Sequence, residues 1–149
     1  MSKKVCVIGA GPSGITAAKN LKDEGMDVVV YDLGTEVGGN WVFTEEVGHS
    51  SVFETTHIIS SKTLSEYEDF PMPADYPDYP SHKHLANYFQ NYAREFELYP
   101  LIQFRTLVKH CERLQDGKWK VTIEQNNSET SSVFDTLVVC NGHHWLPRM

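Results

Sequence analysis

Three short runs of apolar, mostly β-branched residues predict the strands of a parallel sheet. They cover residues 4–8, 26–32 and 134–140, and each is continuously hydrophobic rather than alternating. Continuous runs of this length are typical of strands that are buried on both faces. Since the last run ends at Asn141 and Gly142, little of the sequence follows this expected strand.

A helix is predicted between the first two runs. Ile15, Ala18 and Leu21 recur at helical spacing over residues 13–24, and Gly25 supplies a stop at the C-terminal end. The first 32 residues therefore read as a strand, a helix and a parallel strand, a unit that crosses over right-handedly.

A second helix is predicted over residues 81–98, with Ser81 as its cap and Pro100 beyond its end. Four apolar residues form one stripe along it, which we interpret as core packing. They are Leu85, Phe89, Tyr92 and Phe96.

Residues 33–81 show no lasting periodicity, and the second half of this stretch is rich in proline. Glu66, Glu68 and Asp69 lie within it and are expected to form a solvated face. Irregular segments of this length in compact domains are usually functional. A bound ligand could therefore order this excursion.

Two antiparallel strands are predicted at residues 104–114 and 119–124. Asp116 and Gly117 lie between them and suit a tight hairpin turn. A polar turn is expected over residues 126–132. The predicted fold class is therefore α/β: a Rossmann-type domain, with a parallel sheet that starts as a βαβ unit, carrying a β-hairpin or meander insertion.

Composition supports one globular domain over residues 1–149. The formal net charge of −7 argues against nucleic acid or an anionic membrane surface as partner. No apolar run approaches the roughly 20 residues of a membrane span, and no signal peptide is recognisable, so we expect a cytoplasmic protein. The three cysteines lie far apart without a C-x-x-C pair, which favours reduced structural thiols.

The pattern G-x-G-x-x-G stands between the first predicted strand and helix, as Gly9-Ala10-Gly11-Pro12-Ser13-Gly14. In this context the first glycine permits a tight turn, the second lets a diphosphate approach the backbone, and the third lets helix and strand pack closely. Asp32, at the end of the second strand, could accept hydrogen bonds from a ribose. Because this acid would repel a 2′-phosphate, the motif favours FAD or NAD over NADP.

Gly38-Gly39-Asn40-Trp41 follows within ten residues of Asp32. Two adjacent glycines permit a close backbone approach to a flat ligand. The alternative, a glycine turn beside a core tryptophan, stays open at this point.

The sequence resembles the N-terminal part of the flavin-containing monooxygenases along its whole length. The resemblance rests on the motifs Gly9-Ala10-Gly11-Pro12-Ser13-Gly14, Asp32, Gly38-Gly39-Asn40-Trp41, Ser61-Lys62, Asp69-Phe70-Pro71-Met72-Pro73, Phe104-Arg105-Thr106 and Cys140-Asn141-Gly142-His143-His144.

The resemblance implies that FAD binds through the first glycine loop and that Asp32 holds the adenosine ribose. It also implies roles along the rest of the cofactor: Gly39, Asn40 and Trp41 on the flavin side, Ser60 at the isoalloxazine, Val108 offering its backbone to adenine, and Gly142 close to the FAD. His144 is a weaker candidate, for which a hydrogen-bonded loop position is the better interpretation. Cys140 is interpreted as a small residue beside the cofactor.

The family chemistry implied is oxygenation of a soft nitrogen or sulfur nucleophile in a small molecule. NADPH reduces the flavin, and the reduced flavin forms a C4a-peroxide with oxygen, so no metal or catalytic triad is expected. No catalytic residue is assigned.

Two departures from the family stand out. Ile59 occupies a position where many members carry an asparagine that is thought to support the peroxide; His57 or Thr56 could substitute. A second glycine loop for NADPH and the downstream F-x-G-x-x-x-H segment are missing, so the FAD-binding domain is expected to be incomplete relative to the family. Self-association through the surface that a further domain would cover is then expected.

Two alternatives stay open. One is another FAD- and NAD(P)H-dependent oxidoreductase of the group with two dinucleotide-binding domains. The other is a stand-alone or truncated FAD-binding module without turnover.

Overall fold

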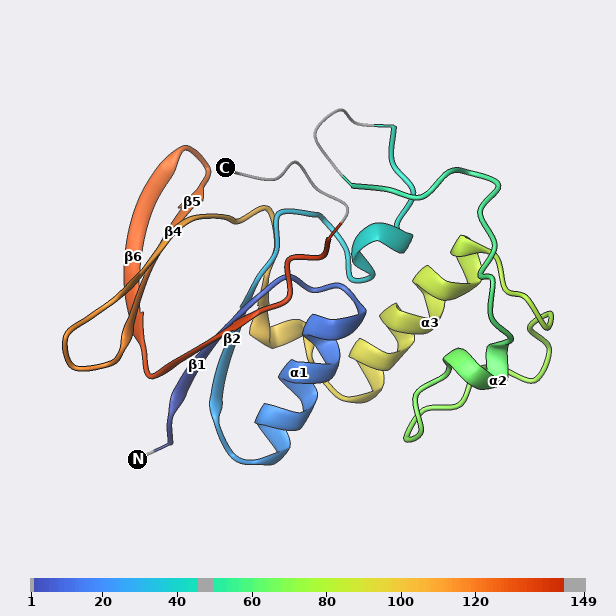
Figure 1. The fold of residues 1–149 in the computed structure, drawn as a ribbon, viewed down its shortest axis with the longest axis horizontal. Helices are drawn as coiled ribbons and strands as arrows, with labels where there is room; N and C mark the ends of the chain where they lie inside the picture. The colour runs from blue at the N-terminus through green and yellow to red at the C-terminus, as the bar shows by residue number, and fades with distance from the viewer. Residues whose placement is uncertain (1, 46–49, 144–149) are drawn as a thin grey trace.

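The structure, a computed structural model, describes residues 2–45 and 50–143. A four-stranded parallel sheet, in the order β3-β2-β1-β7, lies between helices and a three-stranded antiparallel sheet in the order β4-β5-β6 (Figure 1). The elements in chain order are β1 (Lys4–Ile8), α1 (Pro12–Asp23), β2 (Asp27–Tyr31), η1 (Gly39–Trp41), α2 (Lys62–Ser65), α3 (His82–Glu95), η2 (Tyr99–Leu101), β3 (Ile102–Gln103), β4 (Leu107–Arg113), β5 (Trp119–Gln125), β6 (Ser128–Phe134) and β7 (Thr136–Val139). The α/β Rossmann-type prediction is confirmed.

The first two strands are hydrophobic throughout because each faces two apolar layers. Val7 of β1 and Val30 of β2 pack in the core under the helices, whereas Cys6 and Tyr31 face the antiparallel sheet. Adjacent residues of a strand point to opposite faces, so a strand between two layers needs apolar residues at every position. The two strands pair in parallel from Lys4 opposite Asp27 onward, as predicted.

The predicted stripe on the second helix is core packing. Leu85, Phe89 and Tyr92 of α3 are buried, and Phe96 at its C-terminal end packs against the same core. The helix is shorter than expected because the chain turns away at Glu97, which has a φ of +52°.

The expected strand over residues 104–114 begins later than predicted, at Leu107, and it is preceded by a short strand, β3, that the sequence did not predict. β3 extends the parallel sheet beside β2, and the chain then bends at Arg105, where φ is +52°, before β4 begins. The N–H of Thr106 donates to the carbonyl of Asp32 at 2.9 Å, so the bend is tied to the end of β2.

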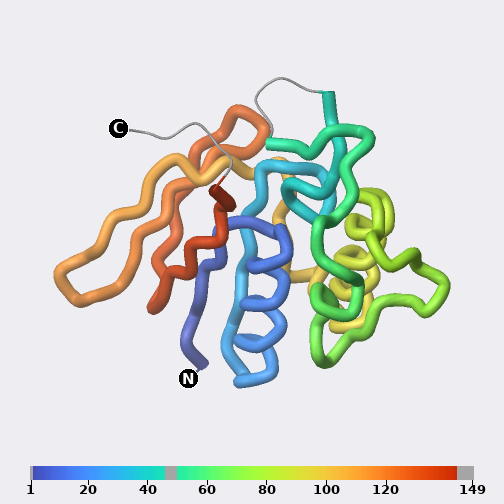
Figure 2. The backbone as a smooth tube through the Cα atoms, turned by 45° about the vertical axis from the view of Figure 1, so that its right-hand side comes forward, coloured from blue at the N-terminus to red at the C-terminus, as the bar shows by residue number. Residues whose placement is uncertain are grey.

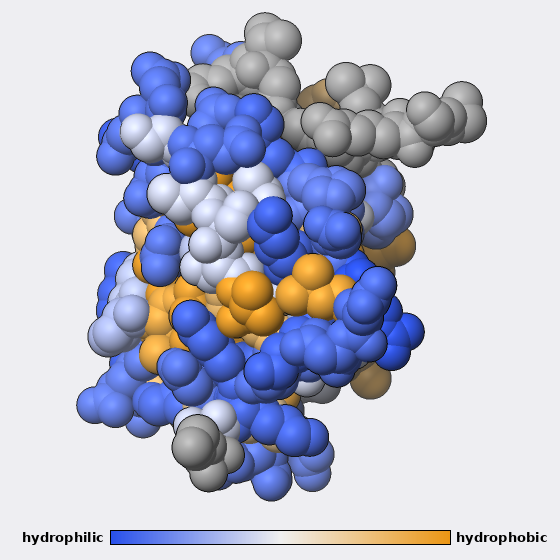
Figure 3. Space-filling model, turned by 90° about the vertical axis from the view of Figure 1, so that its left-hand side faces the viewer, coloured by the Kyte–Doolittle hydropathy of each residue, from blue (hydrophilic) through white to orange (hydrophobic). Residues whose placement is uncertain are grey.

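The expected polar turn over residues 126–132 is also wrong, since the turn is only two residues long. Asn126 and Asn127 have φ of +52° and +58°, which matches the two-residue hairpin turns that prefer asparagine. The polar residues that follow form β6, which pairs with β5 and completes a meander. Most residues of β6 are polar and exposed, so the sequence carries no hydrophobic pattern that predicts this strand. This side of the molecule is largely hydrophilic, with hydrophobic residues near its middle (Figure 3).

The last strand is less buried than its sequence predicts. β7 pairs in parallel with β1 on one side only and forms one edge of the sheet, and Val139 is 63% exposed. The carboxyl ends of β1, β2 and β7 nevertheless meet at one edge, where the loop after β1 begins.

The excursion between β2 and α3 contains two short helical turns, η1 and α2, and runs beside α3 (Figure 2). Lys62 holds part of it together by donating to the carbonyls of Ala74 and Tyr76 at 2.9 and 2.6 Å. No helix in the described part of the chain has the length and apolar character needed to cross a membrane.

Candidate functional site

The turn between β1 and α1 requires glycine at its two ends. Gly9 has a φ of +102°, and a Cβ atom there would lie 2.4 Å from the carbonyl oxygen of Cys140. A Cβ atom on Gly14 would lie 1.8 Å from the carbonyl oxygen of Gly9. Both glycines therefore let α1 start directly against the strands.

Gly11, between them, is different. Its φ is −72°, which any residue adopts, and a Cβ atom there would meet Gly39 Cα at an ordinary 3.5 Å. The fold therefore does not require glycine at this position. Close approach of a ligand to the backbone would explain a glycine here.

The N-terminus of α1 presents backbone donors beside Gly11. Pro12 takes the first helical position, no side chain caps this end, and the first turn carries no acidic residue. The leading N–H groups of a helix have no partner within it, and the helix dipole favours an anion there.

The carboxylate of Asp32 lies against the same loop. One of its oxygens accepts a hydrogen bond from the N–H of Ala10 at 2.6 Å, and the other accepts one from Gly34 at 2.7 Å. An ionised carboxylate has about four acceptor positions, so two donors leave capacity for hydroxyl groups.

The second glycine pair packs on the first loop. The N–H of Gly38 donates to the carbonyl of Ala10 at 3.1 Å, and a Cβ atom on Gly39 would come within 2.9 Å of Gly11 Cα. Trp41 packs partly buried against the core, so the two interpretations of this segment are compatible. Asn40 accepts a hydrogen bond from the hydroxyl of Ser50 at 2.9 Å.

The other predicted residues lie farther along the chain. Val108 lines an apolar groove between β4 and β7, together with Val139 and Asn141. Gly142 follows β7 with a φ of +75°. Ser60 lies just before α2, where its hydroxyl is 2.7 Å from that of Ser65. The structure thus brings the two glycine loops and Asp32 together, whereas Ser60 is held by its neighbours in the excursion.

Several secondary expectations have clear outcomes. Ile59 is 98% exposed, and the nearby His57 is bonded to the carbonyl of Thr55. Glu66 is half-buried and accepts a hydrogen bond from the N–H of Met72 at 2.7 Å, so a solvated role is wrong for it. His144 lies outside the described residues.

The cysteines are not activated for thiolate chemistry. Burial raises the pKa of Cys6 to about 12, and it also raises the pKa of Cys140. A raised pKa keeps each thiol protonated at neutral pH. Among residues 2–45 and 50–143, no cluster of His, Cys, Asp and Glu could hold a metal ion.

Sequence reasoning missed one residue at this site. The hydroxyl of Tyr67 donates to the carbonyl of Pro12 at 2.9 Å, although the two residues are 55 positions apart. Nothing local in the sequence indicates this contact, since it depends on how the excursion folds back onto α1.

Comparison with known sequences gives a family match over nearly the whole chain. A family model described as flavin-binding monooxygenase-like matches residues 2–149. Flavin-containing monooxygenase 2 of Homo sapiens is 40% identical over 155 aligned residues, which cover 100% of this chain and 29% of that protein. Dimethylaniline monooxygenase (N-oxide-forming) 2 of Macaca mulatta shows the same identity and coverage. The chain therefore spans 29% of the length of these curated relatives.

Solved structures show the same fold. S-allyl-L-cysteine S-oxygenase of Allium sativum superimposes with a TM-score of 0.90 and 26% identity, over 99% of this chain and 38% of that one. Tmm of Pelagibacter superimposes with a TM-score of 0.85 over 98% of this chain and 38% of that one. At 23% identity, the second likeness concerns the fold alone.

Proposed function

This chain belongs to the flavin-binding monooxygenase-like family, and from that premise we propose that it is the FAD-binding part of a flavin monooxygenase. The observation that carries the proposal is the contrast within the glycine loop: an added Cβ atom would clash with backbone at Gly9 and Gly14, whereas at Gly11 it would make only ordinary contact, with Gly39 Cα at 3.5 Å. The fold does not account for glycine at this position, whereas close approach of a diphosphate beside the unpaired N–H groups of a helix would account for it.

The residues at this site fit FAD. The first turn of α1 would hold the diphosphate through backbone N–H groups, without a competing acidic side chain. Asp32 would accept hydrogen bonds from the adenosine ribose while its own bonds keep it against the loop. Gly39 and Trp41 would lie on the flavin side, Val108 near adenine and Gly142 near the point where the chain leaves the sheet.

A bound flavin would supply the redox chemistry, with NADPH as electron donor and dioxygen as oxidant. The chain's own contribution is to bind and orient the cofactor, since the site contains no activated thiol. The hydrogen bond from the N–H of Gly38 to the carbonyl of Ala10 would hold the second glycine pair against the first loop while the cofactor binds.

The substrate class proposed is a small molecule with a soft nitrogen or sulfur nucleophile. Two relatives support it by name, one as an N-oxide-forming dimethylaniline monooxygenase and the other as an S-allyl-L-cysteine S-oxygenase. This chain covers 29% and 38% of the lengths of these two relatives. We therefore propose the complete reaction for a protein of the relatives' length and FAD binding for this chain.

Two measurements test this function: the visible absorption spectrum of the purified chain, and then an assay of substrate oxidation. The purified chain is expected to retain FAD, with visible flavin absorption. NADPH and thioanisole are then added under air, and sulfoxide formation is measured. Sulfoxide would support a self-sufficient monooxygenase, whereas flavin absorption without NADPH consumption would indicate a binding module. A colourless chain that does not take up added FAD would contradict the proposal.

Replacing Asp32 by alanine is expected to weaken FAD binding by about 1–3 kcal/mol, because charge-assisted hydrogen bonds to the ribose are lost. Asp27→Ala is the matched control, since it removes the same charge from the exposed other end of β2. Fluorescence titration with FAD measures both variants. Equal affinity for Asp32→Ala and wild type would reject the ribose role.

A further inference from the structure

The segment 66–72, called here the 66–72 turn, folds into a closed loop between α1 and α3. The N–H of Phe70 donates to the carbonyl of Tyr67 at 3.1 Å. The N–H of Met72 donates to the carboxylate of Glu66 at 2.7 Å. These bonds within the turn give it a defined shape.

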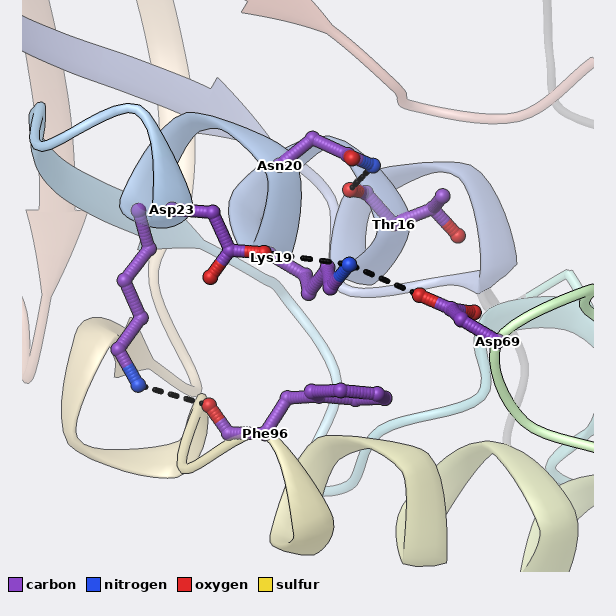
Figure 4. A network of polar contacts seen from close by, with 7 residues as sticks. Thr16, Lys19, Asn20, Asp23, Asp69 and Phe96 are labelled. Carbon is purple, nitrogen blue, oxygen red and sulfur yellow. Dashed lines mark hydrogen bonds and ion pairs between the residues drawn. The ribbon is translucent and has the colours of Figure 1, made fainter.

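One contact fixes the 66–72 turn to the middle of α1. The carboxylate of Asp69 lies 2.8 Å from Lys19 Nζ, and Lys19 also contacts Asp23 at 3.1 Å (Figure 4). The ammonium group of Lys19 lies 5.1 Å from the ring centre of Phe96, at the end of α3. Lys19 is half-buried and Asp69 is exposed, so this ion pair adds little stability, but it links the turn to α1.

Tyr67 is held from the other side by α3. Its ring packs against those of Tyr88, Phe89 and Tyr92, with the Tyr92 ring centre 4.7 Å away. The backbone N–H of Tyr67 also donates to the hydroxyl of Tyr88 at 2.7 Å. Ring and backbone are therefore both anchored, and the hydroxyl is directed at the carbonyl of Pro12.

The carbonyl of Pro12 belongs to the peptide group that contains the N–H of Ser13. It accepts hydrogen bonds from the hydroxyls of Tyr67, at 2.9 Å, and Thr16, at 2.8 Å. Hydrogen bonds in a chain polarise one another, so donors on a carbonyl make the N–H of the same peptide a stronger donor. The N–H of Ser13 lies in the first turn of α1, where the helix provides no acceptor for it.

We propose that Tyr67 is a positioning residue for the diphosphate: through the carbonyl of Pro12, its hydroxyl orients and polarises the Ser13 N–H that donates to the bound diphosphate. This inference rests on the proposed function, since it concerns the same loop. Burial raises the pKa of Tyr67, which keeps its hydroxyl protonated and able to donate at neutral pH.

Tyr67→Phe tests the inference, because it removes the hydroxyl and keeps the ring in its aromatic cluster. The affinities for FAD and for ADP, which share the diphosphate, are expected to fall together by about twofold, because polarisation strengthens the charge-assisted bond from Ser13 by about 10–30%. Tyr92→Phe is the matched control: it alters the same cluster, but the side-chain bonds to Pro12 come from Thr16 and Tyr67. Unchanged affinities in Tyr67→Phe, or an equal loss in Tyr92→Phe, would overturn the inference.

A second measurement separates polarisation from a merely structural role. The sequence contains two Pro-Ser pairs, Pro12-Ser13 and Pro80-Ser81. Labelling proline with ¹³C at the carbonyl and serine with ¹⁵N therefore selects two amide signals. Tyr67→Phe is expected to move the Ser13 amide proton upfield in the chain without ligand and to leave that of Ser81 in place. A Ser13 signal that does not move would overturn the inference.

The two proposals can fail separately. A wild-type chain that binds neither FAD nor ADP would end the proposed function and this inference with it. A wild-type chain that binds both, beside a Tyr67→Phe variant of equal affinity, would end the inference alone. Should Tyr67→Phe fail to fold, Thr16→Val removes the other hydroxyl from the same carbonyl, and the same loss of affinity and upfield shift are expected.

Discussion

Replacing Gly11 by valine is expected to leave the chain folded and to abolish FAD binding. The backbone at Gly11 has an ordinary φ of −72°, and a Cβ atom would meet its nearest neighbour, Gly39 Cα, at 3.5 Å. The fold therefore tolerates a Cβ atom here, and we expect the added side chain to obstruct a diphosphate that approaches the loop. A side chain that crowds the ligand costs about 1–3 kcal/mol of binding free energy. We therefore expect FAD affinity to fall roughly tenfold for Gly11→Ala and roughly 100-fold or more for Gly11→Val.

The measurement is FAD titration beside thermal unfolding in the absence of cofactor. A graded loss of affinity from glycine through alanine to valine, with little change in melting temperature, is the expected result. A yellow Gly11→Val protein with bound FAD would show that the ligand does not enter beside this residue. Equal loss of affinity and of stability would show instead that glycine at this position serves the fold.

The parts of the fold that the sequence predicts are those determined by local contacts. The segment from β1 to β2 is predicted correctly because its pattern follows from burial. The strands contact apolar residues on both faces and are continuously apolar, whereas α1 contacts the core on one face and carries one apolar stripe. β6 is missed because its exposed residues are polar and only its hydrogen bonds with β5 make it a strand. The two-residue β3 is missed because it owes its existence to pairing with β2.

The same distinction between local and long-range contacts holds for the candidate site. The glycine pattern and Asp32 can be read from the sequence, because a strand, a tight turn and a helix place them within one βαβ unit. The contact of Gly38 with Ala10 and that of Tyr67 with Pro12 cannot, because each joins segments whose approach depends on the path of the excursion. Irregular backbone has no period from which such an approach could be predicted.

Replacing Gly14 by alanine is expected to have the opposite outcome to a change at Gly11, because it removes stability first. A Cβ atom on Gly14 would lie 1.8 Å from the carbonyl oxygen of Gly9, which is backbone and cannot rotate away. The start of α1 would have to move off β1, and a loss of about 4 kcal/mol or more is expected, at the upper end of single substitutions.

Gly25→Ala supplies a graded control for this prediction. Gly25 has a φ of +73° but no atom within 4 Å of an added Cβ, so only the left-handed backbone is penalised, by about 1–2 kcal/mol. Urea denaturation of both variants measures the difference. A Gly14→Ala variant as stable as Gly25→Ala would mean that α1 can shift at little cost. The close packing of helix on strand would then not be what holds the glycine loop in shape.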